Sequence, residues 1–166
     1  MNAERLTLLT TELRKWPCEQ FNFGVWVEDD WKGKPDLSCG TSACALGVAT
    51  TIPVFQALGL KLTKDKYGIG YVIIDGKPPV IDGRDTLLLS TSLESAMTIF
   101  ELTLAEARYL FVPDQEPCEL FFSEQVIESL ESSPNDEASP TEVANHIERY
   151  ISARLGAVPI STHESP

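Results

Sequence analysis

One ten-residue stretch, residues 38–47, limits the folds open to this chain more than any other. It reads Ser-Cys-Gly-Thr-Ser-Ala-Cys-Ala-Leu-Gly, a polar turn that passes directly into small apolar residues, with a cysteine on each side of the junction. Such a junction is typical of a helix start, capped here by Ser38 or Thr41, and small residues let a helix lie close to its neighbours. We therefore expect a central, buried helix over residues 42–50, with Cys44 inside it.

The remaining patterns predict further helices on both sides of this one. Leucines recur at helical spacing over residues 3–16, and Pro17 ends that pattern. Ser/Thr-x-x-Glu capping patterns predict helices that begin at Thr91, Thr103 and Ser139. Pro53 either ends the central helix or starts a short second one over 53–58, with a stop at Gly59. The other expected ranges are 3–16, 92–102, a short helix after 103 that ends near 111–113, 124–131 and 140–155, with a stop at Gly156.

Residues 60–83 have a different character, because β-prone runs alternate with turn residues. Residues 60–62 alternate, residues 71–74 are rich in Val and Ile, and residues 79–81 return after an Asp-Gly turn. The predicted fold class is therefore α+β: a mainly helical single domain over residues 1–156 with a small antiparallel β element. Residues 60–83 are an embellishment of it, and residues 157–166 are expected to form a flexible tail.

Aromatic residues crowd the segment that precedes the central junction. Residues 21–27 alternate as a short strand would, although an irregular segment anchored by its aromatics fits equally well. If these side chains pack against the central helix, they belong to the core, which is the favoured interpretation. If Trp26 or Trp31 stays exposed beside the acidic residues 28–30, the two tryptophans form a binding patch.

The charge of −12 is concentrated in the second half of the chain. Residues 84–166 carry 15 acidic and 4 basic residues, whereas residues 1–83 are nearly balanced, with 10 acidic and 9 basic. An acidic surface repels phosphates, which argues against direct binding to nucleic acids, and it favours a basic protein partner. The expected contacts for such a partner are Glu124, Glu128 and Glu131, although a simply solvated face explains the same charges.

Several segments together resemble a group of uncharacterised small bacterial and phage-encoded proteins. They are Phe-x-Phe-x-x-Trp at residues 21–26, Cys-Gly-Thr-x-Ala-Cys-x-x-Gly at 39–47, residues 100–113 and the helix start at 139–144. The resemblance spans most of the chain but not residues 60–83. It implies a shared fold and an origin in a phage or mobile element, and it implies no activity.

The Cys-Gly-x-x-x-Cys pattern before an alanine-rich helix also looks superficially like the nucleophile helix of papain-like cysteine peptidases. A helix start stabilises a thiolate, and Cys39 is the better-placed candidate. The nucleophile of such enzymes needs a histidine base, and the chain offers only His146, in the last helix, and His163. The sequence departs from those peptidases because no histidine precedes its strand. We expect both cysteines to be packing residues and His146 to lie at the surface or its boundary.

Other chemistries lack their patterns. The cysteines at 18, 39, 44 and 118 form no Cys-x-x-Cys pair, so neither a metal nor a cofactor is expected. No apolar run is long enough to span a bilayer, the first residues do not resemble a signal peptide, and a reducing cytoplasm is the expected compartment. The sequence leaves the oligomeric state open.

Two functions from different classes remain. The first is a small acidic, non-enzymatic protein-interaction module or inhibitor of phage or mobile-element origin. The alternative is a thiol-dependent protein, papain-like or redox-sensitive, that uses Cys39. We favour the first, because the sequence shows no base or orienting residue placed to activate the thiol.

Overall fold

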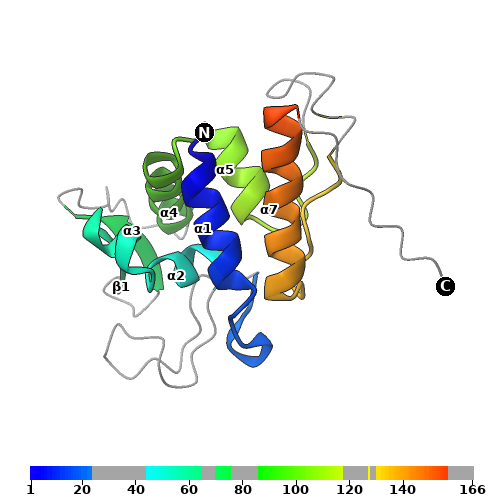
Figure 1. Cartoon of the computed structure of the whole chain (residues 1–166). Coiled ribbons are helices and arrows are strands. Elements are labelled where there is room, and N and C mark those ends of the chain that lie inside the picture. Colours follow the sequence, from blue (N-terminus) through cyan, green and yellow to red (C-terminus); the bar gives the residue numbers. More distant parts are fainter. Residues whose placement is uncertain (24–43, 65–69, 76–85, 118–126, 128–129, 157–166) are drawn as a thin grey trace.

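The computed structural model describes residues 1–23, 44–64, 70–75, 86–117, 127 and 130–156, which form a helical body with one small sheet (Figure 1). In chain order the elements are α1 (Ala3–Leu13), the 3-10 turn η1 (Cys18–Gln20), α2 (Ala45–Ala49), α3 (Pro53–Ala57), β1 (Leu60–Lys64), β2 (Gly70–Ile74), α4 (Thr86–Phe100), α5 (Leu104–Phe111) and α7 (Pro140–Leu155). The expected fold class, mainly helical α+β with a small antiparallel sheet, is confirmed.

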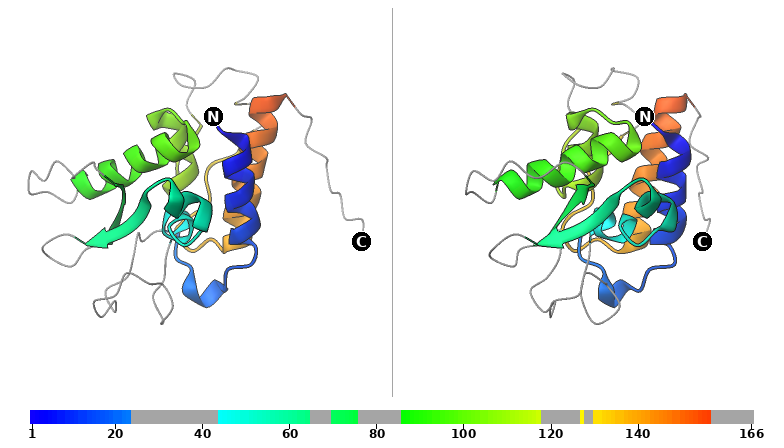
Figure 2. Two further views of the ribbon diagram at one scale, coloured as in Figure 1. Left: turned by 60° about the vertical axis from the view of Figure 1, so that its left-hand side comes forward. Right: turned by 90° about the vertical axis from the view of Figure 1, so that its left-hand side faces the viewer.

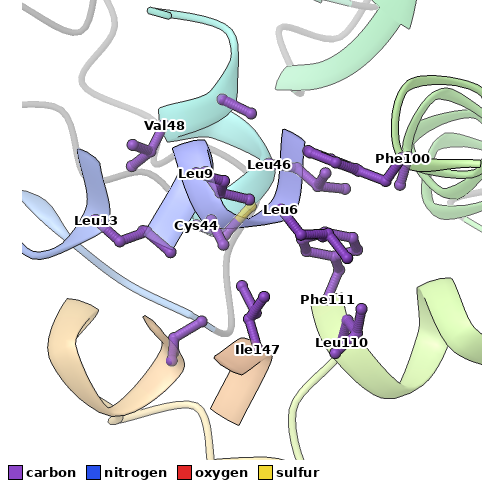
Figure 3. Close-up of a cluster of buried hydrophobic side chains, with 14 of the residues drawn as sticks. Leu6, Leu9, Leu13, Cys44, Leu46, Val48, Phe100, Leu110, Phe111 and Ile147 are labelled. Carbon is purple, nitrogen blue, oxygen red and sulfur yellow. The ribbon is translucent and has the colours of Figure 1, made fainter. Parts of the chain in front are cut away.

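Helix α2 is buried within the core, as the small residues of the central junction predict. All of its residues are buried, and Figure 3 shows Leu46 and Val48 among side chains from α1, α4, α5 and α7. The helix is shorter than expected. Cys44 keeps an extended backbone, with ψ at 179°, and precedes the helix as its N-cap, so the expectation that Cys44 lies inside the helix is wrong. The predicted caps, Ser38 and Thr41, lie outside the described residues.

Helices α1 and α7 lie side by side and antiparallel (Figures 1 and 2). The leucines of α1 face the core, which confirms the amphipathic pattern, although the helix ends at Leu13 rather than at residue 16. Beyond that end, Arg14 holds α7: its Nη2 donates to Asn145 Oδ1 at 2.7 Å and to Glu148 Oε2 at 2.8 Å. The first and last helices of the chain thus form one packed pair. The stacked rings of Phe21 and Phe23 follow η1 and are buried, in accord with the core interpretation of these aromatics.

The sheet pairs β1 with β2 in antiparallel register, with Leu62 opposite Val72. The predicted strand at 71–74 is confirmed, but its partner is the segment 60–64; the predicted return strand at 79–81 lies outside the described residues. Helix α4 lies beside β2 (Figure 2). Ser92 Oγ accepts from the Val72 N–H and Ser95 Oγ donates to the Val72 carbonyl, both at 3.1 Å. The two serine hydroxyls of α4 therefore satisfy the N–H and the carbonyl of Val72, which in a larger sheet would bond to a neighbouring strand.

Helix α4 differs most from its predicted bounds. The pattern at Thr91 predicts a start at residue 92, whereas the helix begins at Thr86 and Thr91 lies in its interior. The helix extends because residues 87–89 are consecutive leucines, which favour helix, so Thr91 is not needed as a cap. At the other end, the Asn2 N–H donates to the Phe100 carbonyl at 2.7 Å, and Arg5 Nη1 donates to the Ile99 carbonyl at 2.7 Å. The start of α1 therefore caps the end of α4.

The two remaining capping predictions are confirmed in full. Thr103 and Glu106 form a reciprocal capping box at the start of α5, and Ser139 and Glu142 form another at the start of α7. The predicted stops at Gly59 and Gly156 also hold, with φ at +87° and +69°, a conformation that glycine adopts without strain. The predicted helix at 124–131 falls mostly outside the described residues, as does the whole of the tail at 157–166.

Candidate functional site

Most of the candidate residues named from the sequence fall outside the part of the chain that the structure describes. These are Cys39, Trp26, Trp31, Glu124 and Glu128. Two candidates, His146 and Glu131, are described, and so is the second cysteine of the central junction, Cys44. The chemistry that the described residues support can therefore be judged from their burial and their partners.

Cys44 occupies the position at which a helix start would activate a thiol, yet its surroundings oppose activation. The residue is 2% exposed, and its sulfur lies among core side chains (Figure 3). Burial raises the pKa of the thiol to about 11, and the opposing effect of the backbone N–H groups of Leu46 and Gly47 is smaller. At neutral pH Cys44 is therefore a neutral, apolar packing residue.

His146 is buried, so the expectation of a surface or boundary position is wrong. The residue is 1% exposed, and its Nε2 lies 3.0 Å from the Tyr109 carbonyl oxygen at the end of α5. In a regular helix that oxygen would accept the N–H of residue 113, but Pro113 has no N–H to give. Because a carbonyl can only accept, Nε2 carries the proton and His146 takes the place of the missing donor.

The surroundings of His146 keep it neutral. Burial lowers its pKa to about 4 and the charge of Arg149 adds to this effect, while the hydrogen bond to Tyr109 opposes it. The ring centroid of Tyr109 lies 4.6 Å from that of His146 and 6.1 Å from that of Tyr150. A group enclosed in this way and already bonded to a backbone carbonyl is a structural cap, not a general base for a thiol.

Glu106 forms a second buried polar contact between α5 and α7. Its carboxylate accepts from the Thr103 N–H at 2.7 Å and the Thr103 hydroxyl at 2.9 Å, and also from the Tyr150 hydroxyl. Arg154 Nη2 lies 3.2 Å from the same carboxylate. Burial raises the pKa of Glu106, but the Tyr150 and Thr103 hydrogen bonds and the charge of Arg154 outweigh it, so the net pKa is lowered. The capping pattern predicts the contact with Thr103; the sequence gives no sign of the contacts with α7.

Exposed carboxylates lie on two paired loop segments, 113–117 and 131–137, and of these the sequence analysis singled out Glu131 alone. The Ser133 N–H donates to the Gln115 carbonyl at 2.8 Å, and the Ser133 hydroxyl accepts from the Gln115 N–H at 2.6 Å. Figure 1 traces the second segment, in yellow-orange, down to the start of α7. We call these two joined segments the acidic ledge; their exposed carboxylates belong to Asp114, Glu116, Glu131, Asp136 and Glu137.

The acidic ledge carries little compensating positive charge. Within the described part of the chain, Glu131 is the ledge carboxylate that forms an ion pair: its Oε2 lies 2.8 Å from Arg149 Nη1. The hydroxyl of Ser132 donates to Glu116 Oε1 at 2.7 Å. Glu131 is the one of the three predicted partner-binding glutamates that the structure describes. It is exposed, and its charge is partly compensated by Arg149.

Neither a metal centre nor a membrane helix is found among the described residues. No three His, Cys, Asp or Glu side chains in the described ranges group in a way that could hold a metal ion. In the same ranges, no helix combines the length and the apolar composition that crossing a bilayer requires.

The two described cysteines are expected to differ strongly in reactivity. Cys18 is exposed and Cys44 is buried, so at about pH 7.5 N-ethylmaleimide should modify Cys18 at least about 100-fold faster than Cys44. Peptide mass spectrometry after timed labelling measures both rates in one sample, and labelling in denaturant serves as the control that both thiols can react. Comparable rates in the native protein would contradict the assignment of Cys44 as a core residue.

Comparison with known proteins adds no family: no family model, no curated protein and no solved structure matches this chain.

Proposed function

We propose that this chain is a non-enzymatic protein-interaction module or inhibitor of phage or mobile-element origin, and that it binds a basic surface of a protein partner. The observation that carries the proposal is the acidic ledge, where five exposed carboxylates stand on two loop segments joined by hydrogen bonds. The alternative, a thiol-dependent protein, depends on Cys39, and the described histidine, His146, is buried and bonded to the Tyr109 carbonyl. The proposed compartment is the cytoplasm, where an exposed thiol such as Cys18 stays reduced.

Charge and local order together favour binding of a partner at the ledge. A net charge of −12 attracts a basic protein from a distance and speeds the encounter with it. The Ser133–Gln115 hydrogen bonds already hold the backbone of the ledge, so binding there costs less conformational entropy than it would on unanchored loops. The same charge repels nucleic-acid phosphates, which favours a protein partner over DNA or RNA.

The buried positions of Cys44 and His146 support a non-enzymatic role. Cys44 is enclosed by the core, and His146 is bonded to the Tyr109 carbonyl. Enzymes that use such residues place them where a substrate reaches them and where their pKa suits proton transfer. Here burial moves both pKa values away from neutrality, in the direction that leaves both groups uncharged.

The test removes three of the five ledge charges by isosteric substitutions that keep the size of each side chain. A variant that combines Asp114→Asn, Asp136→Asn and Glu137→Gln removes three ledge charges that make no described ion pair. Immobilised wild-type protein and variant are compared for capture of basic proteins from a bacterial lysate, at low and at moderate salt. We expect the ledge variant to lose at least about tenfold in affinity for a partner that the wild type retains.

A matched control separates the ledge from the total charge of the protein. Glu4, Glu19 and Glu94 are also exposed, and changing all three to glutamine shifts the net charge by the same amount away from the ledge. We expect this control to bind as the wild type does. Equal losses in the two variants, or capture of no protein that distinguishes them, would refute the ledge as the binding surface.

A further inference from the structure

Tyr109 connects the buried histidine to the acidic ledge. Its carbonyl accepts the His146 Nε2–H at 3.0 Å, and its hydroxyl donates to the Glu131 carbonyl at 2.5 Å. Its ring also lies against the His146 ring, with a centroid distance of 4.6 Å. Any displacement of His146 therefore acts on the residue that anchors the beginning of the segment 131–137.

The groups around His146 do not favour a positive charge there. The charged or titratable side chains on the neighbouring elements are Glu106, Arg108 and Tyr109 on α5, Glu142, Glu148, Arg149, Tyr150 and Arg154 on α7, the five carboxylates of the ledge, and Glu12, Arg14 and Lys15 at the adjoining end of α1. Three of these carboxylates are engaged with other groups: Glu106 accepts from Tyr150, Glu131 pairs with Arg149, and Glu148 pairs with Arg14. Glu142 caps α7, and Glu12 pairs with Lys15. The charge that acts on His146 is that of Arg149, and it opposes protonation.

We propose that His146 makes the joint between α5 and α7 an acid-sensitive latch for the acidic ledge. A proton taken up at Nδ1 creates an imidazolium in a buried site that already faces the charge of Arg149. The imidazolium gains hydration by leaving that site, and this breaks the hydrogen bond between His146 Nε2 and the Tyr109 carbonyl. Tyr109 then moves, and the hydrogen bond from its hydroxyl to the Glu131 carbonyl is weakened. The latch holds the ledge in place at neutral pH and releases it in acid, whether or not the ledge has a partner.

The direction of the pH dependence follows from linkage. The pKa of His146 is about 4 in the folded state, below the ordinary value of 6.5 that applies once the residue is released. Between these values the open state binds more protons than the latched state, so the latched state loses stability as the pH falls. The latch is fully favoured above about pH 6.5 and is progressively weakened below it.

Hydrogen exchange of single amides tests the latch directly. The Ser133 N–H, bonded to Gln115, reports on the ledge, and the amides of Leu9 and Leu13 in α1 report on the whole fold. After correction for intrinsic exchange, the protection of the Ser133 amide should fall at least about tenfold between about pH 7 and pH 4.5, and more than that of the α1 amides. An equal fall at both places would show global unfolding and would overturn the latch.

The variant His146→Gln is the decisive control, because its amide nitrogen can replace Nε2 as a donor to Tyr109 and does not titrate. We expect its Ser133 protection to change little over the same pH range. A fall equal to that of the wild type would overturn the proposal. The imidazole resonance of wild-type His146 supplies a second measurement, which needs no variant: titration near its ordinary value of 6.5 would also overturn the latch.

Discussion

Replacing Phe100 with alanine should lower the free energy of unfolding by about 3–5 kcal/mol. Phe100 is fully buried at the end of α4, and its ring centroid lies 5.4 Å from that of Phe55 in α3 and 5.4 Å from that of Phe111 in α5. Figure 3 shows its side chain directed into the core beside Leu46. Removing the ring leaves a cavity between three helices, and rigid neighbours on several sides prevent the site from closing.

Urea denaturation followed by circular dichroism measures this loss, because stability falls linearly with denaturant. The control is Val54→Ala on α3, whose side chain is 53% exposed; it should cost less than about 0.5 kcal/mol. If the two variants unfold at similar urea concentrations, Phe100 does not lie in the core as described. The free energy of unfolding of a small domain is often only about 5–15 kcal/mol, so this loss is a large fraction of the total.

The parts of the fold that the sequence predicts depend on residues close together in the chain. The capping box from Ser139 to Glu142 needs four consecutive residues, and it is found where it was predicted. The stop at Gly156 and the leucine face of α1 are likewise local patterns. Local patterns also mislead at element ends, as at Thr91, which lies inside a longer leucine-rich helix instead of capping one.

The buried polar contacts could not be predicted in the same way, because each depends on a distant partner. His146 and Tyr109 are 37 residues apart, and Glu106 and Tyr150 are 44 residues apart. The sequence does point toward the first contact. Pro113 has no N–H to donate to the Tyr109 carbonyl, so that carbonyl needs a donor from elsewhere. Nothing in the sequence states that a histidine from the last helix supplies it.

The ledge shows the same limit for charged residues. An excess of acidic residues in the second half of the chain predicts an acidic surface, and Glu131 is the predicted residue that lies on the ledge. The pairing of segments 113–117 and 131–137 decides which carboxylates come together, and that pairing runs through Ser133, a residue with no charge. Composition therefore predicts the sign of a surface, whereas hydrogen bonds between distant loops decide its shape.

Changing Glu106 to alanine should cost about 3 kcal/mol, the second-largest effect expected in this chain. The loss leaves the buried Tyr150 hydroxyl and the exposed Arg154 guanidinium without their carboxylate, and it removes the cap of α5 at Thr103. Urea denaturation at about pH 7 measures the change. The matched control is Glu142→Ala, which removes the same capping glutamate from an exposed position and should cost about 1 kcal/mol.

The pH dependence of this difference tests the charge of Glu106 itself. Its pKa is lowered in the folded state, so the charged carboxylate contributes stability above its ordinary value of 4.5, and that contribution is lost as the pH falls through the folded-state pKa. The gap between wild type and Glu106→Gln should therefore be widest near neutral pH and should narrow in acid. A gap that does not change with pH would mean that Glu106 acts only by shape and hydrogen bonding. In that case Arg154, which lies 3.2 Å away, would add no electrostatic stabilisation to the joint between α5 and α7.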